Sequence, residues 1–315
     1  MRVLITGGAG FIGSHLVRSC VAAGDRVQVL DDFSSGHWRN LAGVDESKLE
    51  VTTGSVVDLE LVRKLAAGCE VIYHLAAQPS VPKTIEEPIE SHHANATGTL
   101  NVLEAARMEK VARVVFASSC AVYGDASEED KHEAMAPDPR SPYALQKLTG
   151  EFYCRQYAEL FGIGAIALRF FNVFGPRQDP NSAYAAVVPR FAAALAEGGQ
   201  ATIFGDGEQT RDFVYVGDVV DAVRAAAAAP PEARGRVLNI ASGESRSSLD
   251  VHGLIADALG CETIEPQFAP PRPGDVRHSR ADVSEAARVL GWTSRVSFED
   301  GVARILAESV GRRDA

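Results

Sequence analysis

The stretch T-G-G-A-G-F-I-G at residues 6–13 constrains the fold of this chain more than any other. It follows a short apolar run and precedes a segment with the apolar spacing of a helix, and Gly7, Gly10 and Gly13 are three residues apart. Between a strand and a helix, the first glycine permits a tight turn and the second lets backbone amides approach a pyrophosphate. The third allows close packing of helix on strand. The pattern therefore predicts a dinucleotide site at the start of a parallel sheet.

Strand-like and helix-like stretches alternate through the first half of the chain. Candidate strands lie at 3–6, 26–31, 71–75, 113–119 and 165–171, and candidate helices at 12–23, 58–67, 95–109 and 142–161. Because parallel strands need crossover connections, this alternation predicts an α/β fold, namely a Rossmann-type doubly wound parallel sheet.

The alternation of strand-like and helix-like stretches ends at about residue 175, after which Gly, Pro, Asn and Gln cluster. Loops of this composition at the carboxyl side of a doubly wound sheet usually build a substrate site. We therefore expect a dinucleotide-binding domain at 1–175 and a smaller mixed α/β substrate lobe at 176–315, with segments near 212–243 interleaving with the first domain. Stretches at 218–229, 236–241 and 297–307 are expected to rejoin the main body.

Charge and cysteine content limit the partners of the chain. The 315 residues include 31 Lys and Arg against 42 Asp and Glu, which gives a net charge of −11 and argues against nucleic acid or an anionic membrane surface. No apolar run approaches the ~18 residues that a membrane span needs. The five cysteines, Cys20, Cys69, Cys120, Cys154 and Cys261, show no CxxC spacing. We expect a cytoplasmic protein with reduced thiols.

Two acidic residues end the second predicted strand. Asp31 lies 18 residues after Gly13, where a carboxylate can accept hydrogen bonds from the ribose hydroxyls of a dinucleotide. No arginine stands beside it to bind a 2′-phosphate, so NAD is favoured over NADP. Asp32 is a second candidate contact or a solvated neighbour.

The segment S-P-Y-A-L-Q-K at 141–147 has the features of a helix start, with serine as N-cap and proline at the first helical position. Tyr143 and Lys147 then lie one turn apart on one face. A free tyrosine is a poor base at neutral pH, with a pKa near ~10. Lowering that pKa by two to three units takes roughly 3–4 kcal/mol, which an ammonium and an oxidised nicotinamide can supply. The alternative is a surface tyrosine beside a solvated lysine.

These features, with the serine pair at 118–119, resemble the extended short-chain dehydrogenase/reductase family over residues 1 to about 310. Further matches to its nucleotide-sugar branch are H-L-A-A at 74–77 and the longer stretches at 168–178, 205–216 and 274–282. The resemblance implies that Tyr143 is the catalytic base, that Lys147 also holds the nicotinamide ribose, and that Ser119 hydrogen-bonds the reacting sugar oxygen. It also implies a homodimer with a four-helix contact between helices near 95–109 and 142–161.

The resemblance implies a cofactor site for NAD. Ser55 stands where the family commonly has an aspartate on the adenine amine, which puts cofactor affinity rather than cofactor identity in doubt. The implied contacts are Gly7, Gly10, Phe11, Ile12, Gly13, Asp31, Asp32, Ser55, Val56, Leu75, Ala76, Ala77, Asn95, Tyr143 and Lys147.

The residues after Ser119 indicate which reaction of the branch to expect. Dehydratases of the family carry Asp-Glu there, to remove a C5 proton and expel the C6 oxygen, and decarboxylases usually keep the glutamate. This chain has Cys120 and Ala121. GDP-fucose synthases carry Ser-Ser-Cys, with a histidine where this chain has Arg177. We expect Cys120 to be a packing residue and the reaction to be a 4-epimerisation, which needs no second acid or base.

The resemblance also implies a UDP-sugar site. Arg211 and Arg272 would clamp the diphosphate, Asp275 would accept from the uridine ribose, and Phe204 would lie near the uracil or in the core. Ser279 occupies the position beside the C2 substituent of the sugar, where a small residue leaves room for an N-acetyl group. The implied contacts are Ser80, Ser119, Asn172, Ala186, Val187, Phe204, Arg211, Arg272, Asp275 and Ser279.

The expected substrates are therefore the pairs UDP-GlcNAc/UDP-GalNAc and UDP-Glc/UDP-Gal. A UDP-glucuronate 4-epimerase stays open, with Arg177 or Arg190 meeting the carboxylate, as do a dehydratase, a decarboxylase and a non-enzymatic NAD-binding regulator. Among the histidines, His74 is expected in the core. The others that we considered, His92, His93 and His278, lack the spacing of a metal site, so no metal is expected.

Overall fold

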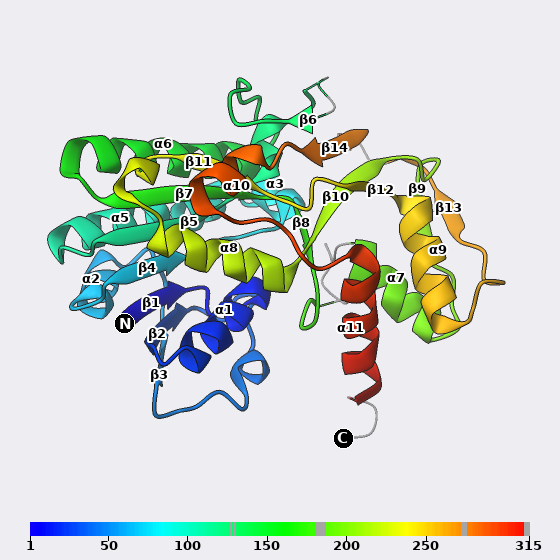
Figure 1. The fold of residues 1–315 in the computed structure, drawn as a ribbon, viewed down its shortest axis with the longest axis horizontal. Coiled ribbons are helices and arrows are strands. Elements are labelled where there is room, and N and C mark those ends of the chain that lie inside the picture. Colours follow the sequence, from blue (N-terminus) through cyan, green and yellow to red (C-terminus); the bar gives the residue numbers. More distant parts are fainter. Residues whose placement is uncertain (127, 129, 180–186, 272–275, 312–315) are drawn as a thin grey trace.

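The computed structural model describes residues 1–126, 128, 130–179, 187–271 and 276–311. Its centre is a seven-stranded sheet in the order β11-β7-β5-β4-β1-β2-β3, with every neighbouring pair parallel (Figure 1). The strands are β1 (Arg2–Thr6), β2 (Arg26–Asp31), β3 (Leu49–Thr53), β4 (Val71–His74), β5 (Arg113–Ser119), β7 (Gly164–Phe170) and β11 (Val237–Ile240). The strand order reverses between β1 and β4, as in a doubly wound sheet.

Helices cover both faces of this sheet, as the apolar runs of its strands require. One face packs against α1 (Phe11–Ala22) and α8 (Val216–Ala228). The other packs against α2 (Leu59–Ala66), α5 (Gly98–Met108) and α6 (Pro142–Phe161). Short helices complete this half: η1 (Trp38–Leu41), α3 (Val81–Glu86), α4 (Pro88–His92), η2 (His93–Thr97), η3 (Cys120–Tyr123), η4 (Pro231–Ala233) and α10 (Ser284–Leu290).

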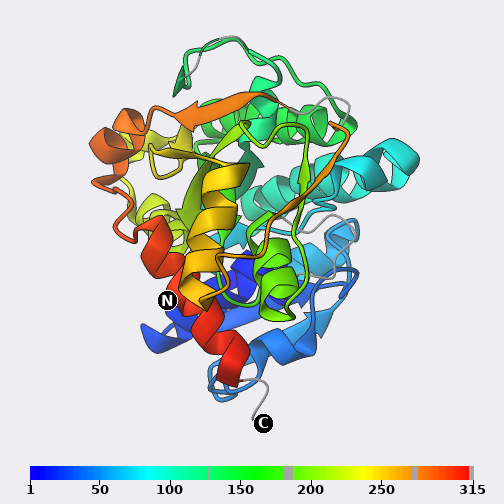
Figure 2. The ribbon, with the colours of Figure 1, turned by 90° about the vertical axis from the view of Figure 1, so that its right-hand side faces the viewer.

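A second set of strands stands beyond the carboxyl ends of the large sheet. It has the order β12-β10-β14-β6, with β8 also paired to β10, and β9 pairs separately with β13. These strands are β6 (Asp130–Lys131), β8 (Asn172–Phe174), β9 (Thr202–Phe204), β10 (Thr210–Tyr215), β12 (Ser245–Ser247), β13 (Gln267–Ala269) and β14 (His278–Ala281). The helices α7 (Val187–Ala196), α9 (Ser248–Leu259) and α11 (Phe298–Gly311) gather at this end of the molecule (Figure 1, Figure 2).

The predicted Rossmann-type doubly wound sheet with a smaller mixed lobe is confirmed. All the candidate strands and helices of the first 171 residues are present, whereas β3 was not among the candidates. The stretches at 218–229 and 236–241 do return to the large sheet, as α8 and β11. The expectation for 297–307 was wrong, because α11 packs against α9 and β10 through its own apolar face. The domain boundary near residue 175 stays a prediction.

No helix in the described part of the chain combines the length and apolar character needed to cross a bilayer.

Candidate active site

A cavity of ≈ 800 Å³ opens at the carboxyl ends of the parallel strands. Its walls contain all the predicted cofactor contacts except Asn95, together with the predicted catalytic Ser119. Lining residues that sequence reasoning missed include Ser34, Ser35, His37, Gln78, Lys83, Glu87, Glu90, Phe171, Gln178 and Asp179. One cavity therefore holds the glycine turn, the end of β2 and the start of α6.

The glycine turn brings the backbone of β1 against the first turn of α1. Gly7 has φ +72°, and a Cβ added to it would lie 2.7 Å from the amide nitrogen of Ala76. A Cβ on Gly13 would lie 2.1 Å from the carbonyl oxygen of Gly7. The N-cap residue of α1, Gly10, offers no side-chain cap, and the first turn carries no acidic residue. The first amides of the helix are therefore available for an anionic group such as a pyrophosphate.

Asp31 is held in one orientation at the end of β2. Its Oδ2 accepts from the Ala9 amide at 2.8 Å and its Oδ1 from the Phe33 amide at 2.8 Å. Burial raises the pKa of this carboxyl, and the two amide hydrogen bonds oppose that shift. The carboxylate lines the cavity and keeps further lone pairs for ribose hydroxyls. Asp32 also lines the cavity, but its Oδ1 accepts from the amide and the hydroxyl of Ser34.

The far end of the cavity includes Ser55 and Val56. The hydroxyl of Ser55 accepts from the Val57 amide at 3.2 Å, so it is partly used within its own turn.

Asn95 lies behind the cavity wall rather than on it. Its side-chain amide bonds to both backbone groups of Gln78, with 2.7 Å from the Gln78 nitrogen to Oδ1 and 3.1 Å from Nδ2 to the Gln78 oxygen. Asn95 therefore supports a segment that lines the cavity.

Tyr143 and Lys147 extend from the first two turns of α6 into the cavity. The helix begins as its sequence predicts, with the Ser141 hydroxyl accepting from the Ala144 amide at 3.2 Å and proline in the first turn. The Lys147 ammonium lies 5.8 Å from the centre of the Tyr143 ring. The helix therefore brings the two side chains together at the end of β5.

The protonation of this pair follows from its burial. Lys147 donates to the carbonyl oxygen of Ala117 at 2.7 Å, and burial lowers the pKa of its ammonium to about 8. Burial raises the pKa of the Tyr143 phenol to about 12, with a hydrogen bond to Ser119 opposing the shift. Without a further positive charge, the phenol keeps its proton at neutral pH. The phenolate expected from the sequence therefore needs positive charge in addition to that of Lys147.

A buried ion pair that sequence reasoning missed lies next to these residues. Arg169 on β7 forms two bonds to the Glu151 carboxylate, of 2.9 and 2.7 Å. The same carboxylate accepts from the Ser118 hydroxyl at 2.5 Å. Glu151 stands four residues after Lys147 on α6, and this spacing was the only signal in the sequence. The ion pair fixes this helix to β7, and the Ser118 hydrogen bond fixes it to the end of β5 that carries Ser119.

Cys120 and Ala121 form the start of η3, directly after Ser119. Cys120 packs against a small apolar cluster that includes Val122, Leu148 and Phe171. Burial raises the pKa of the Cys120 thiol to about 11, so the thiol is protonated and apolar in character. This environment agrees with the packing role expected for it.

The remaining substrate candidates lie on other elements. Asn172 is on β8, Phe204 on β9, Arg211 on β10 and Ser279 on β14. Arg211 and Ser279 are register partners on neighbouring strands, and the charge of Arg211 acts on the Cys120 thiol. Val187 begins α7, and Ser80 caps α3 by accepting from the Lys83 amide at 3.2 Å. Of the described substrate candidates, Ser119 alone lines the ≈ 800 Å³ cavity, and Ala186, Arg272 and Asp275 lie outside the described residues.

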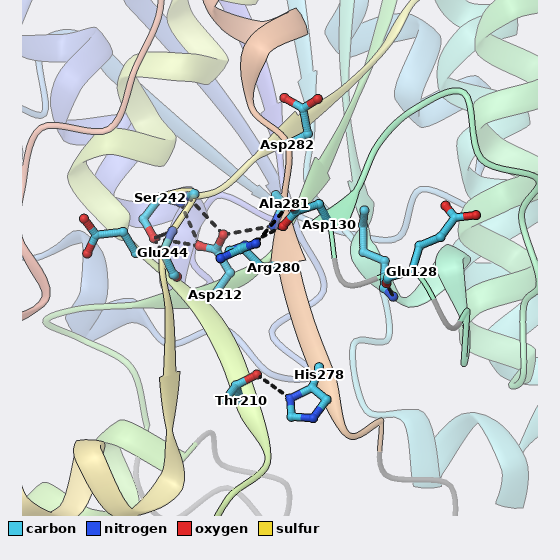
Figure 3. Close-up of polar contacts among 12 residues, drawn as sticks. Glu128, Asp130, Thr210, Asp212, Ser242, Glu244, His278, Arg280, Ala281 and Asp282 are labelled. Atoms are coloured by element: carbon cyan, nitrogen blue, oxygen red, sulfur yellow. Dashed lines mark hydrogen bonds and ion pairs between the residues drawn. The ribbon is translucent and has the colours of Figure 1, made fainter.

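Polar contacts join the strands on this side (Figure 3). Arg280 on β14 pairs with Asp130 on β6, and the Thr210 hydroxyl and His278 Nδ1 lie 3.0 Å apart.

In the large sheet, His74 is 1% exposed and bonds to the hydroxyls of Thr6 and Thr99, as expected of a core histidine. Within the described residues, no group of three or more His, Cys, Asp and Glu is placed to hold a metal ion.

Comparisons with known proteins agree with this geometry. The model of the NAD-dependent epimerase/dehydratase family matches residues 3–241. A UDP-glucose 4-epimerase of Mycolicibacterium smegmatis is 44% identical over 308 residues, which cover 96% of this chain and 97% of the relative. The structure of the UDP-N-acetylglucosamine 4-epimerase of Methanobrevibacter ruminantium, solved with UDP-N-acetylmuramic acid, superposes on this chain with a TM-score of 0.94. The two sequences are 35% identical, and the match covers 99% of this chain and 98% of the epimerase chain. The UDP-glucose 4-epimerase of Thermotoga maritima, solved with UDP-glucose, has a TM-score of 0.93 at 35% identity, over 99% of this chain and 100% of its own.

This chain belongs to the NAD-dependent epimerase/dehydratase family, and it is an enzyme of the UDP-sugar 4-epimerase type. NAD is its cofactor, as the sequence predicted. The residues present fit that group, because the turn at Gly7 and Gly13 is too crowded for side chains, and the first turn of α1 has neither a side-chain cap nor an acidic residue. Asp31 stands in the same cavity with its carboxylate oriented.

Proposed function

We propose that this chain interconverts the C4 epimers of UDP-sugars, namely UDP-GlcNAc with UDP-GalNAc and UDP-Glc with UDP-Gal. The observation that carries the proposal is the composition of the site around Ser119. Tyr143 and Lys147 stand beside it, whereas the positions where dehydratases need an acid and a base hold a protonated thiol and a methyl group, Cys120 and Ala121. Such a site can remove and return hydrogen at one carbon, but the two positions directly after Ser119 offer no acid or base for a second proton transfer.

The roles of the residues follow from their positions. Tyr143 takes the proton of the C4 hydroxyl and returns it after the 4-keto sugar has turned over. Ser119 donates to the same oxygen and holds it against the phenol. Lys147 supplies positive charge and orients the ribose of the cofactor. A bound NAD would supply the acceptor for the C4 hydride and the donor that returns it to the opposite face.

The pKa values fix when Tyr143 can act. Burial raises the pKa of the phenol to about 12, with a hydrogen bond to Ser119 opposing the shift, and Lys147 donates to the Ala117 carbonyl. A bound oxidised nicotinamide would add positive charge near Tyr143 and Lys147 and would lower the pKa of the phenol, because a nearby opposite charge favours the charged form. We therefore expect Tyr143 to be a more effective base in the cofactor-bound enzyme than in the free enzyme.

The choice among sugars rests on Ser279. Its side chain is small, and its strand lies next to β10, where Arg211 is its register partner. A small residue there leaves room for an N-acetyl group at C2. Relatives named for glucose and for N-acetylglucosamine both resemble this chain closely, which supports activity on both pairs.

A UDP-glucuronate 4-epimerase is the second candidate, and two arginine contacts disfavour it. Arg177 Nε donates to the Ser14 hydroxyl at 3.2 Å, on α1. The Arg190 guanidinium lies 5.9 Å from the centre of the Phe204 ring. Both arginines that could meet a sugar carboxylate thus have other contacts. A non-enzymatic NAD-binding regulator is disfavoured because the Tyr143–Lys147 pair is complete.

We further propose a homodimer through α5 and α6. Large apolar side chains are exposed along these two helices in the single chain. They are Met108 (39%), Leu145 (56%), Phe152 (46%), Leu160 (71%) and Phe161 (49%). Pairing of α5 and α6 with the same helices of a second copy would bury this surface. The cytoplasmic location expected from the sequence stays a prediction.

Incubation with UDP-Glc, UDP-GlcNAc and UDP-GlcA separately, with the products resolved by chromatography, tests the proposal. We expect the C4 epimers of the first two and little conversion of the third. Release of a 4-keto-6-deoxy sugar would contradict the assignment of Cys120 and Ala121. Conversion of UDP-GlcA alone would favour the second candidate.

A further inference from the structure

Asp212 is a fully buried carboxylate on β10, with 0% of its surface exposed. Its Oδ1 accepts from the amide and the hydroxyl of Ser242, at 2.8 and 2.7 Å. Its Oδ2 accepts from the Gly243 amide at 3.0 Å and the Ala281 amide at 3.2 Å. Figure 3 shows these contacts converging on one side chain from separate segments. Burial raises the pKa of this carboxyl, and the hydrogen bonds oppose the shift.

The donors come from elements that belong to different sheets. Ser242 and Gly243 form the turn between β11, the edge strand of the large sheet, and β12 of the smaller one. Ala281 is the last residue of β14. Three of the four donors are backbone amides, so the carboxylate fixes main-chain positions. Asp212 therefore joins the edge of the cofactor sheet to two strands of the substrate side.

Three predicted substrate contacts adjoin this junction. Arg211 precedes Asp212 on β10, and because side chains alternate along a strand it points to the opposite face. Asn172 donates from Nδ2 to the Asp212 carbonyl at 3.1 Å. Ser279 stands two residues before Ala281 and is the register partner of Arg211. The backbone of each belongs to, or pairs with, a segment that the Asp212 carboxylate holds.

We propose that Asp212 is a positioning residue, which sets Arg211, Asn172 and Ser279 at a fixed distance from the reacting centre at Ser119. This inference rests on the proposed function, since it assigns these three residues to the UDP-sugar. A buried amide without a partner is costly, so loss of the carboxylate must shift the turn at 242–243 or the end of β14. Either shift moves the substrate contacts relative to the large sheet, while the glycine turn and Asp31 stay in place.

The chain offers a matched control in Asp218 on α8. This carboxylate is also buried, with 3% exposed, and its Oδ2 accepts from the Ser294 hydroxyl and the amides of Arg295 and Val296. Like Asp212, it is a buried carboxylate that accepts from a serine hydroxyl and from backbone amides. The segment that it holds, however, contains none of the predicted binding residues. Asp212→Asn and Asp218→Asn thus remove equivalent buried carboxylates with different consequences for the substrate side.

The test measures UDP affinity, NAD affinity and melting temperature for the full-length wild type and both variants. We expect Asp212→Asn to weaken UDP binding at least about tenfold while NAD affinity changes less than about twofold. Asp218→Asn should lower the melting temperature without changing either affinity. The positioning role is overturned if Asp212→Asn binds UDP like the wild type, or if both variants lose UDP affinity equally. If the wild type itself does not bind UDP, the proposed function fails instead.

A milder pair of variants covers the case in which Asp212→Asn does not fold. Ser242→Ala removes one of the four donors to Asp212, and Ser294→Ala removes the equivalent hydroxyl from Asp218. We expect a weakening of UDP binding by about two- to fivefold for Ser242→Ala only. Equal UDP affinity in these two variants would overturn the inference.

Discussion

The large sheet and the smaller β10-centred sheet place their functional residues in different ways. In the large sheet, Asp31 and Ser119 each end a parallel strand, and the turns after those strands meet at one edge. In the smaller sheet, Arg211 and Ser279 meet although 67 residues of chain separate them. The first arrangement follows from local sequence and parallel topology, and the second only from long-range pairing. The cofactor site should therefore respond to changes within a motif, and the substrate site to changes at junctions.

The largest effect should come from removing the phenol in the first region. We expect Tyr143→Phe to lower turnover by about 10²–10⁴-fold, the usual contribution of a general acid–base group. Binding of NAD and of UDP should change little, because the ring remains. Steady-state rates and equilibrium binding check this, with Tyr153→Phe on the same helix as the control. Comparable turnover in the two variants would remove Tyr143 from the role of base.

The second prediction compares the replacement of a glycine by alanine in each of the two regions. A Cβ on Gly13 would lie 2.1 Å from the Gly7 oxygen, whereas one on Gly253 in α9 meets nothing within 4 Å. We expect Gly13→Ala to destabilise the protein by about 1–3 kcal/mol and to weaken NAD binding. Gly253→Ala should stabilise it by about 0.5–1 kcal/mol, since alanine favours a helix interior. Denaturant unfolding and NAD titration measure both. Retained stability and NAD affinity in Gly13→Ala would contradict the packing role of that glycine.

A third prediction concerns the buried ammonium of Lys147. Its pKa in the folded protein is about 8, below the ~10.4 of a free lysine, so the unfolded chain holds that proton more tightly. The wild type therefore gains stability relative to Lys147→Met as the pH rises from about 8 to about 10.4. At pH 7 and without NAD, we expect Lys147→Met to be the more stable protein, by roughly 1–3 kcal/mol. Denaturant unfolding at pH 7, 8.5 and 10 measures the difference, and a difference independent of pH would contradict the prediction.

The smallest effect should be a change of substrate preference in the second region. Ser279→Tyr should lower kcat/KM for UDP-GlcNAc about tenfold more than for UDP-Glc, because the larger side chain fills the space for the N-acetyl group. Ser279→Ala, which keeps that space, is the control. An equal loss on both substrates in the tyrosine variant would contradict the assignment of this position.

The sequence predicted much of the first region, and the reason lies in how local its signals are. The glycine turn, Asp31 and the Tyr143–Lys147 pair each belong to one strand end or one helix turn, so their spacing already determines their neighbours. Asn95 shows the limit of such reasoning. The family resemblance implied a cofactor contact, which stays a prediction, and in the structure its side chain bonds to the backbone of Gln78, which lines the cavity. Whether a side chain faces a cavity or supports the wall depends on packing that no local pattern encodes.

The sequence by itself determined the class of fold, the cofactor and the absence of an acid beside Ser119, because these depend on residues adjacent along the chain. Tertiary structure decided that Glu151 pairs with Arg169 and that α11 packs against α9 and β10. It also decided that Asp212 joins turns and strands from distant parts of the sequence. The physical reason is that burying an unpaired charge costs free energy, so each buried charge is paired with groups that the fold brings close, however far apart they lie in the sequence. The sequence shows that a charged residue is present, but it does not show which residue will pair with that charge in the folded protein.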